Sequence, residues 1–241
     1  MKLVVLTDIH GNLEAFKSVL KEIEKINPDR IISLGDNVGY GADPELVMTL
    51  LKKHTIESVL GNHEFAVIND KFINWFNPSA QIAVNYTKKN ISDSSVAEIK
   101  TFKKSMITEN LRFVHGAPLN AVSVYLFQIS DEKLMRTLDK MDESICFAGH
   151  THDLGLIEYD GKILKRIPLK RGITILNRDY KYIVNTGSVG QPRDGDNSAK
   201  FILFDTASYC LDVRFVPYNY KRAAEKIIDA GLPTTYADKL Y

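Results

Sequence analysis

Five short apolar runs, each followed by polar residues able to bind metal ions, constrain this chain of 241 residues more than any other feature. Short β-rich runs bounded by glycine or polar residues predict buried strands. The runs are 3–6, 31–34, 58–60, 111–114 and 145–148, and the motifs after them are Asp8-Ile9-His10, Gly35-Asp36-Asn37, Gly61-Asn62-His63-Glu64, His115-Gly116 and Gly149-His150-Thr151-His152. Because sites in open α/β sheets form beyond the carboxyl ends of strands, we expect the motifs to meet there. Their imidazole, carboxylate and amide groups predict a metal centre, with enough donors for two ions.

The residues between the first runs predict helices that join parallel strands. Apolar residues keep helical spacing from Leu13 to Ile23, and Pro28 closes that segment. Pro44 begins a second helix that extends to about residue 53, with Asp43 as its expected N-cap. Right-handed helical crossovers of this kind connect parallel strands of one sheet.

The rest of the chain predicts a helical segment and then antiparallel strands. Expected helices are 78–89, 95–103, 131–141 and 220–230; expected strands are 154–159 and 162–167, joined by a type I′ turn at Asp160-Gly161, and then 181–184, 200–204 and 210–215. We therefore predict an α/β fold of two mixed β-sheets packed face to face as a sandwich, with helices on the outside. A single domain should span residues 1–241, with a helical insertion at about 71–105 near the site.

Charge and cysteine usage exclude some partners and compartments. The formal net charge is +1 without a long run of one sign, whereas a nucleic-acid groove or an anionic membrane needs a larger basic excess. Cys146 and Cys210 lie in apolar runs, so we interpret them as buried thiols rather than a redox pair or metal site. The first apolar run stops at Thr7, too early for a signal peptide, and no stretch is long enough to span a bilayer. We expect a cytoplasmic protein.

In their order and separations, the motifs between residues 8 and 152 resemble those of the calcineurin-like metallophosphoesterase superfamily. That family has the pattern D-x-H, G-D-x-x-D, G-N-H-[D/E], a single His, and G-H-x-H, on a fold of two mixed sheets between helices. The resemblance implies hydrolysis of a phosphoester by a hydroxide that bridges two metal ions. It also implies a role for each donor: Asp8, His10 and His152 on one metal, Asn62, His115 and His150 on the other, Asp36 bridging both, and His63 as the catalytic histidine.

The charge of such a centre suits a phosphoryl group. Two carboxylates and one hydroxide against two divalent cations leave about +1, which favours an anionic substrate. Mixed imidazole and oxygen ligands suit transition metals better than Ca²⁺ or Mg²⁺. We expect two divalent ions, with manganese first and iron, zinc, nickel or cobalt as alternatives. The expected partner is a small phosphorylated substrate.

The chain departs from the family pattern at two adjacent positions. Gly39 stands where the second aspartate of G-D-x-x-D orients the catalytic histidine, so what orients His63 is open. Tyr40 stands where phosphoprotein phosphatases have an arginine, which argues against that branch.

The loop from Asn185 to Arg193 narrows the branch. It resembles the asparagine-x-glycine-serine loop of small prokaryotic phosphodiesterases and bis(nucleosyl)-tetraphosphatase-like proteins. We expect it at the mouth of the site, with Asn62, His63 and Arg193 contacting the substrate, because arginine suits bidentate phosphate binding. The alternative for Arg193 is a solvated side chain.

The sequence thus predicts a metal-dependent phosphodiesterase or nucleotide hydrolase. Alternatives are a phosphomonoesterase, including a phosphoprotein phosphatase, and a non-catalytic protein-binding scaffold like the retromer subunit of this fold. A retired site would have lost donors, and none is lost here. Segment 71–105 is the expected determinant of substrate choice. Within it, Trp75 and Phe76 either stack on an aromatic group or pack in the core, and core packing is the favoured interpretation.

Overall fold

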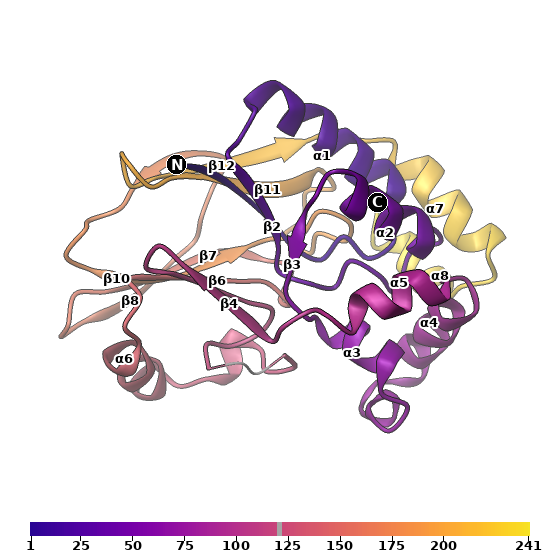
Figure 1. Ribbon diagram of the computed structural model, residues 1–241, viewed down its shortest axis with the longest axis horizontal. Coiled ribbons are helices and arrows are strands. Elements are labelled where there is room, and N and C mark those ends of the chain that lie inside the picture. Colours follow the sequence, from indigo (N-terminus) through magenta and orange to yellow (C-terminus); the bar gives the residue numbers. More distant parts are fainter. Residues whose placement is uncertain (120–121) are drawn as a thin grey trace.

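Two mixed six-stranded sheets pack face to face in the computed structural model, which describes residues 1–119 and 122–241 (Figure 1). The first sheet has the strand order β3-β2-β1-β11-β12-β9, and the second has the order β4-β5-β6-β10-β7-β8. The strands are β1 (Lys2–Leu6), β2 (Arg30–Ser33), β3 (Glu57–Ser58), β4 (Ser105–Thr108), β5 (Leu111–Val114), β6 (Ile145–Ala148), β7 (Leu154–Tyr159), β8 (Leu164–Ile167), β9 (Gly172–Ile175), β10 (Lys181–Thr186), β11 (Ala199–Asp205) and β12 (Cys210–Val216). The predicted α/β sandwich is confirmed.

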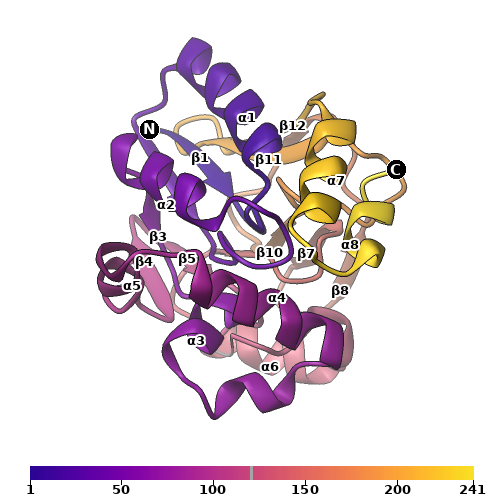
Figure 2. The ribbon, with the colours of Figure 1, turned by 90° about the vertical axis from the view of Figure 1, so that its right-hand side faces the viewer.

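Helices lie on the outer faces of the two sheets and at one end of the sandwich. They are α1 (Leu13–Ile26), α2 (Pro44–Lys53), α3 (Asn62–Ile68), α4 (Pro78–Lys89), α5 (Asp93–Ile99), α6 (Asp131–Lys140), α7 (Tyr220–Asp229) and α8 (Thr234–Asp238), with short 3₁₀ helices η1 (Phe72–Trp75) and η2 (Leu126–Gln128). The C-terminal helices lie at the same end of the molecule as α3, α4 and α5, the end that faces the viewer in Figure 2.

Strand β1 shows how the layers are held together. Its Val5 belongs to the apolar cluster between the sheets, together with Phe147 of β6. Its neighbour Val4 faces the opposite way and packs in the cluster that includes Phe16 of α1. Because alternate side chains of a strand point to opposite faces, β1 is buried on both sides.

The strand directions bring the five donor motifs to one edge of the sandwich. In the first sheet β1, β2 and β3 run parallel, and in the second β5, β6 and β10 do. The donor motifs follow β1, β2, β3, β5 and β6, so each begins at the carboxyl end of a parallel strand. Strand pairs between distant segments complete the sheets, as where β1 pairs with β11 and β6 with β10.

Several local predictions need correction. Helix α5 is Asp93–Ile99 rather than 95–103. The β7–β8 connection is longer than the predicted two-residue type I′ turn, because the carboxylate of Asp160 accepts the N–H groups of Lys162 (2.8 Å) and Ile163 (2.7 Å) and organises it. Asp43 does occupy the N-cap of α2 but makes no side-chain capping bond, and its carboxylate pairs with Lys226 of α7.

No helix in the described part of the chain has both the length and the apolar character that a bilayer crossing requires. The two cysteines are free thiols; Cys146 is buried and Cys210 is half-buried.

Candidate metal centre

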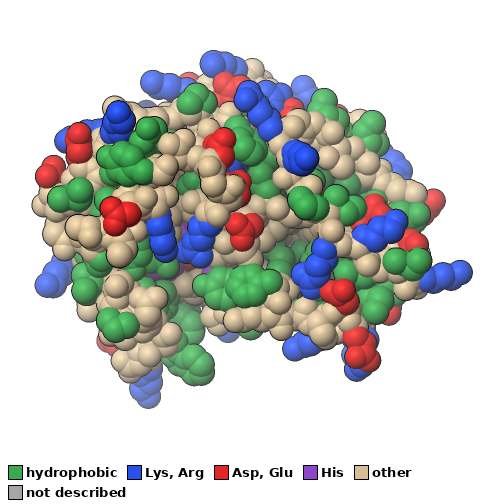
Figure 3. Space-filling model, turned by 180° about the vertical axis from the view of Figure 1, so that it is seen from behind, with side chains coloured by type: hydrophobic (Ala, Val, Ile, Leu, Met, Phe, Trp, Pro, Cys, Tyr) green, Lys and Arg blue, Asp and Glu red, His purple; other side chains and the backbone are tan. Residues whose placement is uncertain are grey.

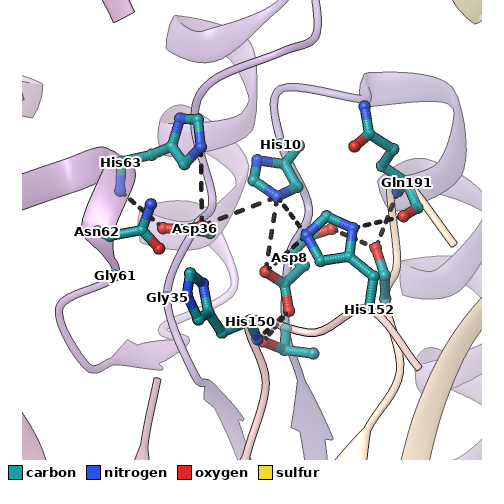
Figure 4. Close-up of polar contacts among 12 residues, drawn as sticks. Asp8, His10, Gly35, Asp36, Gly61, Asn62, His63, His150, His152 and Gln191 are labelled. Carbon is teal, nitrogen blue, oxygen red and sulfur yellow. Dashed lines mark hydrogen bonds and ion pairs between the residues drawn. The ribbon is translucent and has the colours of Figure 1, made fainter. Parts of the chain in front are cut away.

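Seven side chains that sequence analysis assigned as metal donors converge beyond the carboxyl ends of the parallel strands. All of them except His115 are labelled in Figure 4. All are buried, and they come from five separate segments of the chain, each of which follows a strand. Donor atoms of three overlapping groups lie within 4.8 Å of one another: Asp8, His10 and His152; Asp36, His115 and His150; and His10, Asp36 and His63. The predicted convergence is therefore present, while the role of each residue stays a prediction.

The first group presents three electron-rich atoms to a common point. His10 Nδ1 faces the carbonyl oxygen of Val38 at 3.2 Å, and His152 Nδ1 faces that of Gln191 at 2.5 Å. A carbonyl only accepts hydrogen bonds, so in the neutral rings each Nδ1 carries the proton and each Nε2 keeps a lone pair. The two Nε2 atoms lie 3.1 Å apart, and 3.5 and 3.3 Å from Asp8 Oδ1. These three atoms could together hold a cation.

The second group repeats this logic around His115. Its Nδ1 donates to the carbonyl oxygen of Leu34 (2.9 Å), which leaves Nε2 facing the centre. That Nε2 lies 2.9 Å from Asn62 Oδ1, 3.2 Å from His150 Nδ1 and 3.2 Å from Asp36 Oδ2. Imidazole, amide and carboxylate donors thus share a second point.

Asp36 lies between the two groups. Its Oδ2 is 3.2 Å from His115 Nε2 and 3.8 Å from His10 Nε2, so one oxygen reaches both donor sets. Its Oδ1 accepts the backbone N–H of His63 at 2.8 Å, which fixes the orientation of the carboxylate.

The electrostatics keep Asp8, Asp36, His150 and His152 in forms that bind cations. Burial opposes ionisation of Asp8 and Asp36, but the nearby histidines outweigh it and hold both carboxyl pKa values below their usual range. Burial lowers the pKa of His150 to about 3 and that of His152 to about 4. At His115 burial acts in the same direction, but Asp36 outweighs it and raises the pKa to about 9. His115 is therefore protonated in the metal-free protein, and a metal ion would have to displace the proton on its Nε2.

An unpartnered oxygen tests whether a metal fits. Asp8 Oδ1 is buried and has no hydrogen-bond partner among the described residues. Its neighbours, the Nε2 atoms of His10 and His152, present lone pairs rather than N–H groups when their Nδ1 atoms carry the proton. A buried carboxylate oxygen without a donor is costly unless a cation binds it. The donor set therefore fits divalent transition-metal ions.

Glu64 holds the loop that carries Asp36. Its buried carboxylate accepts backbone N–H groups of Asp36 (2.8 Å), Asn37 (2.6 Å), Val38 (3.2 Å) and Gly61 (3.1 Å). Sequence analysis quoted Glu64 in its motif without giving it a role. The available signal was the spacing of three residues from Gly61, the N-cap of α3, because a glutamate at this position can accept the N–H of the N-cap residue.

His63 is held by aromatic rings rather than by a carboxylate. A Cβ atom at Gly39 would lie 2.1 Å from His63 Nδ1, so the ring fills the space that an aspartate side chain would need. The rings of Tyr40, His10 and Phe76 lie edge to face with it at centroid distances of 4.4, 4.9 and 5.0 Å. Its Nδ1 has no hydrogen-bond partner in the described part of the chain. Burial lowers the pKa of His63 to about 3, so the ring is neutral in the ligand-free protein.

The loop from Asn185 to Arg193 holds the backbone of Asp8 and the ring of His152 by hydrogen bonds. Ser188 Oγ (2.8 Å) and the N–H of Gly190 (2.9 Å) both donate to the carbonyl oxygen of Asp8. The carbonyl of Gln191 in the same loop accepts from His152. The sequence placed this loop at the mouth of the site but gave no sign of these backbone contacts. Arg193, at its end, is exposed.

A cavity of about 180 Å³ opens onto the donors. Histidine side chains are visible in a hollow on the face shown in Figure 3, with lysine or arginine side chains beside them. The cavity is lined by Asp36, Tyr40, Asn62, His63, Phe72, Trp75, Phe76, Asn77, Ala80, Ser123, Tyr125, His150, His152 and Arg193. The favoured interpretation of Trp75 as a core residue is wrong, because 84% of its surface is exposed. Tyr125 and Tyr40 are lining residues that sequence analysis did not identify as such.

Comparisons with known proteins agree with this geometry. Residues 1–209 match the family model described as the calcineurin-like phosphoesterase superfamily domain. An uncharacterised protein of Methanocaldococcus jannaschii is 34% identical over 245 residues, which cover 99% of this chain and 97% of that protein. The crystal structure of a metallophosphoesterase from Sphaerobacter thermophilus is 28% identical, with a TM-score of 0.87 over 100% of this chain and 98% of that one. A hypothetical protein of Pyrococcus horikoshii shares the fold at 16% identity, with a TM-score of 0.81 over 100% and 97% of the two chains.

Proposed function

The chain belongs to the calcineurin-like phosphoesterase superfamily and is a phosphoric ester hydrolase, and from this premise we propose that it uses two metal ions to cleave a small phosphodiester or nucleotide. The observation that carries this proposal is the convergence of buried histidine nitrogens and carboxylate oxygens from five segments of the chain on two neighbouring points. Members of this set line a cavity that is open to a substrate.

We assign the donors to two ions by their grouping. Asp8, His10 and His152 would hold one ion, Asn62, His115 and His150 the other, and Asp36 both. When bound, the ions would supply an activated water as the nucleophile and would offset charge on the phosphoryl oxygens. Only two of the seven donors are carboxylates, so the loaded centre keeps a positive charge that attracts an anionic substrate. Manganese is the metal that we propose first.

Other residues of the cavity would bind and orient the substrate. His63 lies on the wall with a ring N–H to donate, so we assign it the hydrogen bond to a phosphoryl or leaving-group oxygen. Arg193 lines the same cavity at its exposed rim, where its guanidinium can reach a phosphate oxygen. A cavity of about 180 Å³ suits a small phosphorylated substrate better than an extended nucleic acid. We place the protein in the cytoplasm, where free thiols stay reduced.

The test is an assay of metal-free protein with bis(p-nitrophenyl) phosphate and p-nitrophenyl phosphate, after addition of Mn²⁺, Ni²⁺, Zn²⁺, Co²⁺ or Mg²⁺. We expect diester cleavage with a transition metal, two metal equivalents bound per chain, and loss of at least about 100-fold in kcat for Asn62→Ala and His150→Ala. His54→Ala is the matched control, because His54 caps the far end of α2 and belongs to neither donor group.

Each contrary outcome has a definite meaning. Cleavage of the monoester alone would make the protein a phosphomonoesterase. Silence with every metal, in folded protein, would favour the protein-binding scaffold.

A further inference from the structure

The single tryptophan of the chain is placed where a substrate would pass. Trp75 ends the 3₁₀ helix η1, and 84% of its surface is exposed. It nevertheless lines the same cavity as Asp36, His63 and His150. Large aromatic side chains exposed beside a polar cavity are typical of ligand-binding surfaces.

Phe72 and Phe76, rather than Trp75, pack η1 against its neighbours. Phe72 packs against Phe65 of α3 at 4.7 Å and against Phe76 at 5.9 Å, and Phe76 contacts His63. These contacts attach η1 to α3. Trp75 stacks on no other ring within residues 1–119 and 122–241. Its indole is therefore dispensable for packing and available to a ligand.

The tyrosine rings that line the cavity are already engaged with other rings. Tyr125 is stacked on His150 at 3.9 Å on one side and on Phe127 at 4.9 Å. Tyr40 contacts His10, His63 and, at 4.5 Å, Tyr236 of α8. Of the larger aromatic rings that line this cavity, Trp75 is the one with a face open to a ligand among the described residues.

We propose that Trp75 is a stacking platform for a flat aromatic group of the substrate, and that the substrate class is a phosphoester bearing a nucleobase or a similar ring. This inference rests on the proposed function, because the anion-binding floor must hold the phosphate while the ring extends toward η1. Base–aromatic stacking contributes affinity without reading base identity, so the platform should tolerate different bases.

The fluorescence of Trp75 tests the contact directly, because no other tryptophan contributes to the signal. Adenosine 5′-monophosphate should quench the emission of metal-loaded protein, whereas ribose 5-phosphate, with the same phosphate and no ring, should not. Equal responses to both compounds, or no response to the nucleotide at concentrations that inhibit hydrolysis, would overturn the proposal.

Kinetics with a matched pair of diesters provide the second test. Thymidine 5′-(p-nitrophenyl phosphate) and methyl p-nitrophenyl phosphate share a leaving group and differ in the base. Both esters carry the p-nitrophenyl ring, so the difference between them reports the base alone. Trp75→Ala should raise KM for the thymidine ester about tenfold more than KM for the methyl ester, with little change in kcat for either. Trp75→Phe keeps an aromatic ring, so its KM for the thymidine ester should lie close to that of the unmodified enzyme.

The control variant is Ile175→Ala, which removes another exposed apolar side chain (77%) from the edge strand β9, outside the cavity. Equal losses with both esters in Trp75→Ala would mean that Trp75 only supports η1, and would overturn the platform. Failure of the unmodified enzyme to cleave either ester would count against the proposed hydrolase, and the fluorescence result would still decide on the platform.

Discussion

Five of the candidate donors hold a backbone conformation that side chains rarely adopt. Asp8, His10, Asp36, His150 and His152 have φ angles between 49° and 68°. Left-handed conformations at non-glycine residues cost about 1–3 kcal/mol each and cluster at functional sites. Here these conformations turn the backbone sharply after each strand, so that the donor side chain points into the centre. The sequence indicated the turns through neighbouring glycines, but it did not reveal that the donors themselves would carry the strain.

The environment of His63 illustrates what sequence reasoning cannot reach. The absence of the second aspartate was visible at Gly39. Its replacement by rings of Tyr40, His10 and Phe76 was not, because three separate loops supply them and no local pattern links those loops.

Gly39→Asp should therefore inactivate the enzyme, although it restores the residue that the family pattern contains. The new Cβ would lie 2.1 Å from His63 Nδ1 and would displace the ring. We expect kcat for a phosphodiester to fall at least about 100-fold, since displacements of about 1 Å have such effects. The number of bound metal ions should stay the same.

Gly195→Asp is the matched control for this substitution. Gly195 has a similar positive φ of 82°, and nothing lies within 4 Å of its would-be Cβ. Its variant should keep normal kcat. Equal or higher activity in Gly39→Asp would show that His63 is not held as we describe.

At the scale of elements, the agreement between sequence and structure follows the strength of local signals. Helices α2 and α4 begin with Pro44 and Pro78 at their first positions, and both match the predicted bounds. Helix α8 has only five residues, which is too short for helical periodicity to appear. Strand β9 is an edge strand whose Ile173 and Ile175 face solvent, so it lacks the burial pattern that would reveal it.

Helix α3 contributes a second prediction through Glu64. In Glu64→Gln an amide NH₂ would replace one acceptor oxygen, and it would face backbone N–H groups that then lose their partner. We expect the free energy of unfolding to fall by about 1–3 kcal/mol, measured by urea denaturation. Glu57→Gln is the control, because Glu57 only forms a partly exposed pair with Arg30 and should change stability little. Equal effects of the two changes would contradict a structural role for Glu64.

At the scale of the whole molecule, the donor loops meet because two sheets pair strands from both halves of the chain. The parallel strands and the sandwich were predictable from short apolar runs and their order. The pairing of β1 with β11, about 200 residues away, was not, since any of several late strands had a suitable apolar pattern.

Metal removal should destabilise the entire fold, because the proposed ions would join loops from both sheets. Without cations, two buried carboxylates and several lone pairs crowd together. Ligand at about 1,000 times its Kd stabilises a folded protein by about 4 kcal/mol, so chelation should lower Tm by several degrees. Calorimetry with and without a chelator measures this shift. The Asp8→Ala variant should show little change on metal addition, and an unmodified protein whose Tm ignores the chelator would count against the centre.

The supporting loop after β10 has a consequence for biosynthesis. Once residues 1–152 have left the ribosome, the nascent chain contains every proposed metal ligand. The groups that hold Asp8 and His152 in place belong to Ser188, Gly190 and Gln191, which are synthesised later. A nascent chain therefore contains the metal-binding side chains before it contains the residues that fix their positions, and we expect it to bind metal ions only weakly at that stage. Prematurely terminated products should act as weak scavengers of cellular cations, and only the nearly finished polypeptide should mature into a catalyst.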